Sequence, residues 1–321
     1  MRAMRVHQPG GLLRLETVAE PEPGPGEALI RVRAAAVNFA DTLMVGGTYQ
    51  ETPPYPFSPG IEICGEVLAL GPGCGPDVPA PGTRVAALCG AGGFAELAVA
   101  PAAACVAAPA AMPDAEAAGL QVAYGTSHLA LERRGRLRPG ERLLVTGAGG
   151  GVGLTAVEIG ALMGAEVIAC ARGEAKQALA RSRGAAHVLE PEPATLRDAV
   201  RALGGADVVY DPVGGAVWEA ALRAANPEGR LIPIGFASGE VPRIPANILL
   251  VKNLEVIGLY WGGYRRFRPE ALADSLRTLL GWWEAGRIRP HVSRVLPLER
   301  AEQALDLLRR REAGGKVALT P

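Results

Sequence analysis

The sequence predicts an α/β fold in which a β-rich, barrel-like domain precedes a doubly wound parallel sheet. Three observations predict it. Short apolar runs separated by Pro- and Gly-rich turns come first, strand and helix patterns then alternate regularly, and a glycine-rich turn at 147–153 joins a strand to a helix. Such an alternation is typical of a parallel sheet with helices on both faces, so we expect two domains of different architecture.

The composition allows two well-packed domains and argues against several classes of protein. Of the 321 residues, 49% are hydrophobic and 21% are charged, which is typical of a globular protein with buried cores. The 33 basic residues balance the 33 acidic ones, so no global positive field attracts nucleic acid or an anionic membrane. We therefore expect a small-molecule substrate, with neither nucleic acid nor membrane as a partner.

The N-terminal segment and the cysteines predict a cytoplasmic protein. Residues 1–10 lack the apolar stretch of a signal peptide, and no run reaches the roughly 20 apolar residues of a membrane-spanning helix. The five cysteines form no CxxC pair and no even set, which argues against a disulfide framework and against a zinc ribbon. We expect reduced thiols.

The β-rich part is predicted from short apolar or alternating runs at 28–34, 62–70, 84–88 and 94–99. Turn clusters at 21–26 and 71–73 separate them. Asp114 can then act as the N-cap of a helix that begins with the alanine-rich stretch after it. The change from strand to helix patterns there predicts a first domain at residues 1–120.

The second domain is predicted from six strand patterns with amphipathic helical stretches between the earlier ones, at 143–146, 166–170, 187–189, 207–210, 230–234 and 254–259. After Trp261, helices around 270–284 and 298–310 lead to a last strand at 316–319. We therefore expect a second domain at 121–260, followed by a C-terminal part at 261–321.

The glycine-rich turn predicts dinucleotide binding. The strand that ends at Thr146 continues directly into the glycines, and an apolar helix follows them. Glycines let the backbone turn tightly and approach a pyrophosphate, while the N-terminus of the helix offers free N–H groups and a partial positive charge. The predicted phosphate-binding residues are Gly150, Gly151, Val152 and Gly153.

The end of the second strand predicts the choice of cofactor. An acidic residue there would bind the ribose 2′-hydroxyl of NAD, but the sequence reads Ala169-Cys170-Ala171-Arg172-Gly173-Glu174-Ala175-Lys176. Arg172 and Lys176 can reach a 2′-phosphate, whereas Glu174 lies two residues beyond Arg172 and can point away. NADPH is the predicted cofactor. The alternative is that both cations are solvated surface residues.

These motifs, and others along the chain, resemble the zinc-free quinone oxidoreductase branch of the medium-chain dehydrogenase/reductase superfamily, which includes zeta-crystallin. The resemblance rests on 38–43 (NFADTL), 47–49 (GTY), 59–62 (PGIE), 147–153, 211–215 (DPVGG) and 235–236 (GF). It implies a GroES-like catalytic domain at 1–120, to which the C-terminal part at 261–321 also belongs, and a Rossmann NADPH-binding domain at 121–260. It also implies a homodimer, or a tetramer built from dimers, with 254–259 as the edge strand that pairs with its twofold mate.

The zinc-binding members of the superfamily differ from this sequence at the expected ligands. They bind catalytic zinc with a cysteine in the first of these motifs and a histidine in a Gly-His-Glu motif. Asn38 and Ile61 occupy those two places here, and the four histidines are scattered along the chain. Since a catalytic zinc needs three protein ligands with N, S or O donor atoms, we expect no metal and no Lewis-acid route.

The resemblance assigns roles to individual residues. It places Asn38 and Tyr49 beside the nicotinamide, with Tyr49 as a proton donor, and Thr126 against the nicotinamide ring. It places the backbone of Gly235 and Phe236 at the carboxamide and Lys316 at the pyrophosphate. Structural alternatives stay open: Tyr49 can be a packed aromatic residue, Asn38 a turn cap and Lys316 a surface lysine, and Asp41 is interpreted as a structural cap.

The expected reaction is the reduction of a quinone or an α,β-unsaturated carbonyl compound by NADPH. Tyr260 and Trp261 are predicted to border the substrate, because flat apolar walls suit a planar acceptor. Arg265, Arg266 and Arg268 would instead favour an acyl-CoA substrate, as in an acrylyl-CoA reductase, unless they form a solvated surface. A crystallin-like or regulatory NADPH-binding protein with weak catalysis is the alternative outside enzymes.

Overall fold

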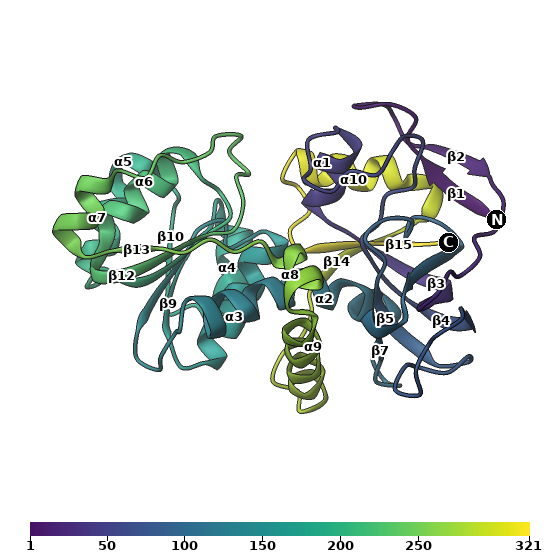
Figure 1. Ribbon diagram of the computed structural model, residues 1–321. Coiled ribbons are helices and arrows are strands. Elements are labelled where there is room, and N and C mark those ends of the chain that lie inside the picture. The colour runs from purple at the N-terminus through teal and green to yellow at the C-terminus, as the bar shows by residue number, and fades with distance from the viewer. The chain divides into compact units, whose positions relative to one another are not determined.

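The computed structural model describes residues 1–321 as two compact units (Figure 1). Unit 1 comprises residues 1–122 and 276–321, and unit 2 comprises residues 123–275. The chain thus returns to unit 1 at residue 276, later than the predicted 261. Tyr264 and Ala271 account for the difference, because they pack against Leu129 in a small core of unit 2.

Unit 1 is built on a seven-stranded sheet that is antiparallel except for one pair. Its strands run in the order β14-β15-β3-β4-β5-β7, with β6 paired to β3. The long β3 is central because β15, β4 and β6 all pair with it. Its last four residues are all buried, whereas buried residues alternate with more exposed ones before them. The bounds are β3 Glu27–Val37, β4 Glu62–Leu70, β5 Arg84–Leu88, β6 Leu97–Pro101, β7 Cys105–Ala107, β14 Val292–Pro297 and β15 Lys316–Thr320.

This sheet confirms the predicted β-rich first part of the fold, and strands of the C-terminal segment take part in it. The parallel pair β14 and β15 joins the sheet through antiparallel pairing of β15 with β3. A separate antiparallel pair, β1 (Arg2–Arg5) and β2 (Arg14–Thr17), was not predicted. The helical segments are η1 Ala102–Ala104, α1 Phe39–Val45, η4 Leu298–Arg300 and α10 Ala301–Arg309. Two more, α2 Asp114–His128 and α9 Pro269–Glu284, include the residues at which the units divide.

Unit 2 contains a six-stranded, all-parallel sheet in the order β10-β9-β8-β11-β12-β13. The order reverses at β8, which lies between β9 and β11, so the crevice used for ligands in doubly wound folds opens at the end of β8. The six predicted strands are confirmed as β8 Arg142–Val145, β9 Glu166–Cys170, β10 His187–Leu189, β11 Ala206–Asp211, β12 Ala225–Pro233 and β13 Glu255–Val256.

The edge strand β13 is shorter than the predicted 254–259. Only Glu255 and Val256 align with β12, and one further backbone hydrogen bond, from the N–H of Ile257 to the carbonyl of Leu231 (2.8 Å), extends the pairing. Helices and helical turns complete the unit: η2 Leu129–Arg134, α3 Gly151–Leu162, α4 Glu174–Ser182, α5 Pro193–Ala202, α6 Gly215–Ala224, α7 Ala246–Lys252, η3 Trp261–Gly263 and α8 Tyr264–Phe267.

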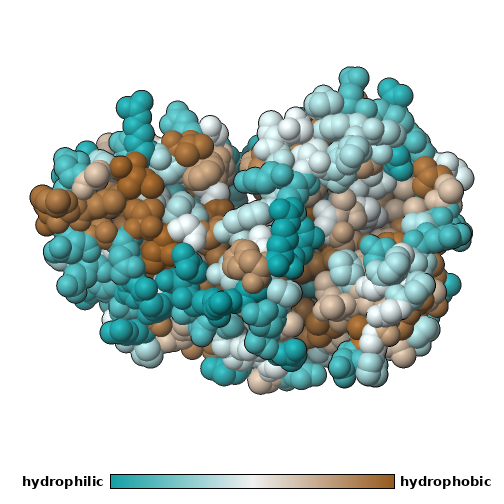
Figure 2. Space-filling view, in the orientation of Figure 1, coloured by the Kyte–Doolittle hydropathy of each residue, from teal (hydrophilic) through white to brown (hydrophobic).

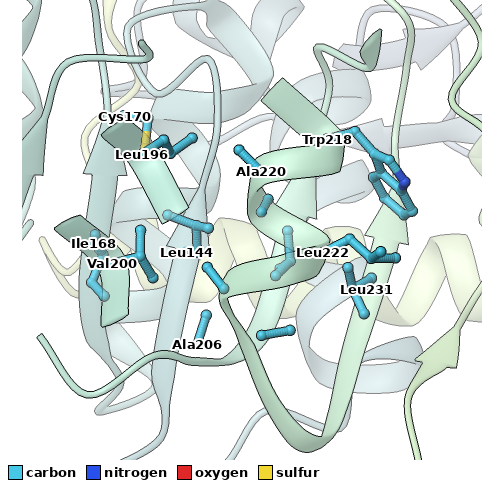
Figure 3. Close-up of a cluster of buried hydrophobic side chains, with 14 of the residues drawn as sticks. Leu144, Ile168, Cys170, Leu196, Val200, Ala206, Trp218, Ala220, Leu222 and Leu231 are labelled. Carbon is cyan, nitrogen blue, oxygen red and sulfur yellow. The ribbon is translucent and has the colours of Figure 1, made fainter. Parts of the chain in front are cut away.

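The core beneath α5 and α6 fixes this sheet. Figure 3 shows Leu144 and Ile168 from the strands facing Leu196 and Leu222 from the helices, with Trp218 at one side. All are buried, and burying each large apolar side chain stabilises the fold by about 1.5–3 kcal/mol. The ends of the strands are thereby held rigidly. None of the helices in the chain combines the length and the apolar composition needed to cross a bilayer.

Candidate functional site

The glycine-rich turn at the end of β8 forms a backbone cradle. The N–H of Ala148 donates to the carbonyl of Cys170 (2.9 Å) and ties the turn to β9. Gly147 has φ +58°, a conformation that glycine adopts without a steric cost. A Cβ on Gly153 would lie 2.2 Å from the carbonyl oxygen of Gly147, so only glycine allows α3 to start this close to the turn.

The start of α3 provides donors for an anion. The first intrahelical bond runs from the N–H of Leu154 to the carbonyl of Gly150 (2.9 Å). The N–H groups of Gly151, Val152 and Gly153 precede it and therefore have no partner within the helix. Together with the positive end of the helix dipole they suit a pyrophosphate. The structure thus brings all four predicted phosphate-binding residues into one turn.

One of the two predicted 2′-phosphate residues lies on this cradle. The Cβ, Cγ and Cδ atoms of Lys176 are 2.7–2.9 Å from the place where a Cβ on Gly149 would be. The aliphatic stem of Lys176 therefore lies across the turn, in a space that a side chain at position 149 would fill. Arg172 is exposed in the loop between β9 and α4. Both cations lie at the β9 side of the turn, and their role at a 2′-phosphate stays a prediction.

An acidic residue that the sequence reasoning missed lies at the same place. The Glu190 carboxylate accepts hydrogen bonds from the N–H of Gly173 (3.2 Å) and from Nε2 of Gln177 (2.6 Å). Glu190 directly follows β10, and β10 is parallel to β9, so the two strand ends meet at one edge of the sheet. The sequence shows Glu190 directly after the third predicted strand. Only the pairing of β10 with β9 shows that this carboxylate lies beside the loop after β9.

Asp211 at the end of β11 joins two loops of unit 2. Its carboxylate accepts hydrogen bonds from the Thr146 hydroxyl and from the N–H groups of Val213 (3.2 Å) and Gly214 (2.8 Å). Burial raises the pKa of this carboxyl group. The N–H of Gly235 reaches the Asp211 carbonyl oxygen at 3.4 Å, so the predicted carboxamide-binding loop is held against the same strand end. Phe236 beside it is 41% exposed.

A buried group of hydroxyls fixes the segment that contains Thr126. The Ser127 Oγ lies 2.8 Å from the Thr155 Oγ1 and 3.0 Å from the Tyr210 hydroxyl, and it donates to the carbonyl of Val152 (3.1 Å). These bonds connect α2 to the first turn of α3. Thr126 itself is buried. The residue next to Thr126 is therefore hydrogen-bonded to the start of α3, which follows the glycine-rich turn.

Trp261 lies beside the same segment of α2. A Cβ on Gly125 would be 3.0 Å from both Nε1 and Cζ2 of the indole, so one edge of the ring rests on the glycine. The indole N–H has no hydrogen-bond partner. Tyr260 is 39% exposed. The structure thus brings Trp261 against Gly125, the residue before Thr126, and it leaves the aromatic pair partly accessible.

In unit 1, Asn38 and Lys316 belong to one buried network. The Lys316 ammonium donates to Asn38 Oδ1 (2.7 Å) and to Glu62 Oε1 (2.7 Å), and Asn38 Nδ2 donates to Glu62 Oε1 (3.0 Å). The second Glu62 oxygen accepts the N–H of Val122 (2.8 Å). Lys316 is only 6% exposed and Glu62 is 0% exposed. The surface-lysine interpretation of Lys316 is therefore wrong, and the Glu62 partner had not been predicted.

Asp41 lies beside this network. Its carboxylate accepts the N–H groups of Asn38 (2.7 Å) and Gly60 (3.0 Å), which agrees with its interpretation as a cap of α1. Burial raises the pKa of Asp41 to about 7, although both hydrogen bonds and the nearby Lys316 ammonium lower it. Tyr49 is half-buried in the turn that follows α1. The role of Tyr49 as a proton donor stays a prediction.

Side chains that could bind a metal ion are not grouped anywhere in the chain. No three His, Cys, Asp or Glu residues lie close enough together to hold one. Ile61 is buried between Gly60 and Glu62, and the nearby Cys89 thiol donates to the carbonyls of Gly60 (3.2 Å) and Ile61 (3.3 Å). Burial raises the pKa of Cys89 to about 12, so this thiol stays protonated at neutral pH.

Known proteins resemble the chain in sequence and in fold. Two family models match it, the alcohol dehydrogenase GroES-like domain over residues 24–110 and the zinc-binding dehydrogenase family over residues 151–277. Quinone oxidoreductase-like protein 2 of Mus musculus is 37% identical over 314 residues, which are 96% of this chain and 89% of the relative.

Two solved structures extend the similarity over the full length of both chains compared. A mycobacterial protein solved in complex with NADPH is 31% identical and superimposes with a TM-score of 0.94. The quinone oxidoreductase of Thermus thermophilus, solved alone and with NADPH, is 34% identical and superimposes with a TM-score of 0.88.

Proposed function

Because the chain belongs to the quinone oxidoreductase branch of the medium-chain dehydrogenase/reductase superfamily, we propose that it transfers a hydride from NADPH to a quinone or an α,β-unsaturated carbonyl compound. The observation that carries the proposal is the cradle at the end of β8. Its shape requires glycine at 153, and the stem of Lys176 lies across Gly149.

The residues present fit NADPH. The free N–H groups at the start of α3 would hold the pyrophosphate, and Arg172 and Lys176 would bind the 2′-phosphate with charge-assisted hydrogen bonds. Thr126 and the backbone of Gly235 and Phe236 would hold the nicotinamide end. When bound, NADPH supplies the hydride, and the protein supplies binding and orientation.

The acceptor side of the reaction needs a hydrogen-bond donor. As hydride adds to carbon, negative charge develops on the carbonyl or quinone oxygen, and a fixed donor there lowers the barrier. We assign this role to the Tyr49 hydroxyl, with water as the alternative proton source. Tyr260 and Trp261 would form flat walls for a planar acceptor, a role that their partial exposure supports.

The network in unit 1 limits what Asn38 can do. Its Oδ1 accepts from Lys316, and one N–H of its Nδ2 is directed to Glu62. A primary amide carries two N–H donors, so one remains for the nicotinamide or the substrate carbonyl. We propose that Asn38 orients one of these groups. Lys316 is already bonded to Asn38 and Glu62 and acts on the site through Asn38.

We propose that the reaction uses no catalytic zinc. Asn38 and Ile61 stand where zinc-binding members of the superfamily carry a cysteine and a histidine, and an isoleucine offers no donor atom. An acyl-CoA substrate has less support. Of the arginines that favoured it, Arg268 lies 3.7 Å from Glu270, which offsets part of its charge.

We also propose a homodimer joined at β13. This strand is the open edge of the sheet in unit 2, and such edges are commonly covered by pairing with a twofold mate. The neighbouring α7 has no buried residue, and Figure 2 shows apolar surface gathered where α7 lies. Leu250 and Val251 on this helix are 76% and 72% exposed. Sedimentation of a monomer at micromolar concentration would contradict the proposal.

A panel of acceptors tests the proposed reaction. NADPH oxidation is followed with p-benzoquinone, cyclohexenone and acryloyl-CoA, and alcohol oxidation, a different reaction, is attempted with NADP⁺ and a primary alcohol. We expect turnover with the quinone or the enone, unchanged by a chelator, and none with the alcohol. Alcohol oxidation that a chelator abolishes would contradict the proposal.

A further inference from the structure

Glu190 places a negative charge next to the residues that would bind the 2′-phosphate. Its Oε1 accepts from the N–H of Gly173 (3.2 Å) and from Gln177 Nε2 (2.6 Å), and Gln177 Nε2 also donates to the carbonyl of Ala171 (3.1 Å). Gly173 is the N-cap of α4. The carboxylate is therefore fixed at the start of the helix whose first turn contains Lys176, and one residue from Arg172.

This location is the end of the second strand of the doubly wound sheet, where an acid in NAD-binding enzymes binds the adenosine ribose. The loop after β9 contains no acid before Glu174, but Glu190 reaches the loop from the end of the adjacent β10. The site thus carries two cations and one fixed carboxylate. Its choice between NADPH and NADH depends on the balance of these charges.

We propose that Glu190 is a specificity-determining residue that opposes the 2′-phosphate and so limits the preference for NADPH. The proposal rests on the proposed function, because it concerns the phosphate end of the same cofactor. Two anions near one helix N-terminus compete for the same N–H group and the same cations. The ribose of NADH carries no such charge, and its hydroxyls can donate to a carboxylate.

The expected effect is moderate because the site is exposed. Glu190, Arg172 and Gly173 are exposed to solvent, which weakens interactions between charges. Replacing Glu190 with Gln removes the charge but keeps an oxygen that can accept from Gly173 and Gln177. We expect Glu190→Gln to lower the Kd for NADPH about threefold to tenfold and to change the Kd for NADH less than about twofold.

Glu192→Gln is the matched control. It removes the same charge two residues further along, but the Glu192 carboxylate accepts only from the N–H of Ala194 (3.5 Å), at the start of α5. This control should change both Kd values less than about twofold, since it contacts neither Gly173 nor Gln177. The gain in NADPH affinity of Glu190→Gln should shrink at about 0.5 M salt, because screening weakens the repulsion that the substitution removes.

Fluorescence titration of the full chain with NADPH and NADH decides between the outcomes. A parent protein that prefers NADPH, with the same NADPH affinity in Glu190→Gln, would overturn the role of Glu190 alone. Equal gains in Glu190→Gln and Glu192→Gln would do the same, since net charge would then explain both. A parent protein that binds neither dinucleotide would overturn the proposed function together with this inference.

Discussion

Unit 1 and unit 2 hold their candidate site residues in opposite ways. In unit 1, the side chains of Asn38, Glu62 and Lys316 bind one another in a buried network. In unit 2, a backbone turn offers N–H groups, and the charged residues near it, such as Arg172, are exposed. A buried network fixes its members but leaves few groups for a ligand, whereas the turn leaves its donors available. Removing a network member should therefore affect stability, and removing a charge near the turn should affect binding.

Lys316→Met should have the largest effect on stability. It leaves the buried Glu62 carboxylate without its cation, and breaking a buried pair in this way costs about 3–5 kcal/mol. We expect a large drop in the urea midpoint, with NADPH affinity of the folded protein changed less than about threefold. The double variant with Glu62→Gln should recover part of the loss.

The same variant tests the role that the resemblance implied for Lys316. A Lys316→Met protein of parental stability that binds NADPH tenfold more weakly would mean that Lys316 contacts the cofactor directly, and the contrast between the two units would then fail.

Arg172→Ala and Lys176→Ala should weaken NADPH binding and leave the free energy of unfolding nearly unchanged, which is the opposite of the effect expected for Lys316→Met. A charge-assisted bond to a phosphate contributes about 1.5–3 kcal/mol, so each substitution should weaken NADPH binding about tenfold or more. NADH affinity should change less than about threefold, since NADH lacks the phosphate. Titration of both dinucleotides checks this, and parallel losses for NADPH and NADH would show that the cations do not bind the 2′-phosphate.

The sequence predicted the glycine-rich turn of unit 2 but not the buried network of unit 1, and the reason is physical. The turn at 147–153 and its flanking strand and helix are contiguous, so local conformational preferences specify them. The network of unit 1 joins residues 38, 62 and 316, which meet only because β15 pairs with β3 and β3 with β4. Glu62 belongs to the motif at 59–62, but the sequence alone did not show that Lys316 and Asn38 are its partners.

Glu190 was missed for a related reason, because its meaning depends on which strand lies beside β9. The pair β1 and β2 was missed because these strands are only four residues long and β2 is largely exposed, so neither shows a clear alternation. The six strands of unit 2 and the glycine-rich turn between β8 and α3 followed from patterns within short windows.

Asp41→Asn should have the smallest effect, and its sign should depend on pH. Because the pKa of Asp41 is raised to about 7, protonated Asp41 contributes stability below pH 4 that is lost as the pH rises through 7. Asparagine is neutral throughout. The free energy of unfolding of the variant, relative to that of the parent, should therefore rise by on the order of 1 kcal/mol between pH 5 and pH 8. Urea denaturation at both pH values measures it. A variant that falls further behind the parent at pH 8 would show that the two N–H groups favour the carboxylate more than burial disfavours it.

The oxidation of NADPH and NADH by p-benzoquinone tests the central claim most directly. Steady-state kcat/KM is measured for both dinucleotides with chelator-treated protein, at low salt so that screening does not hide the phosphate contacts. We expect turnover without metal and a kcat/KM for NADPH at least about tenfold above that for NADH, as one charge-assisted bond to the 2′-phosphate would give. Equal or greater efficiency with NADH, or loss of turnover on chelation, would contradict it.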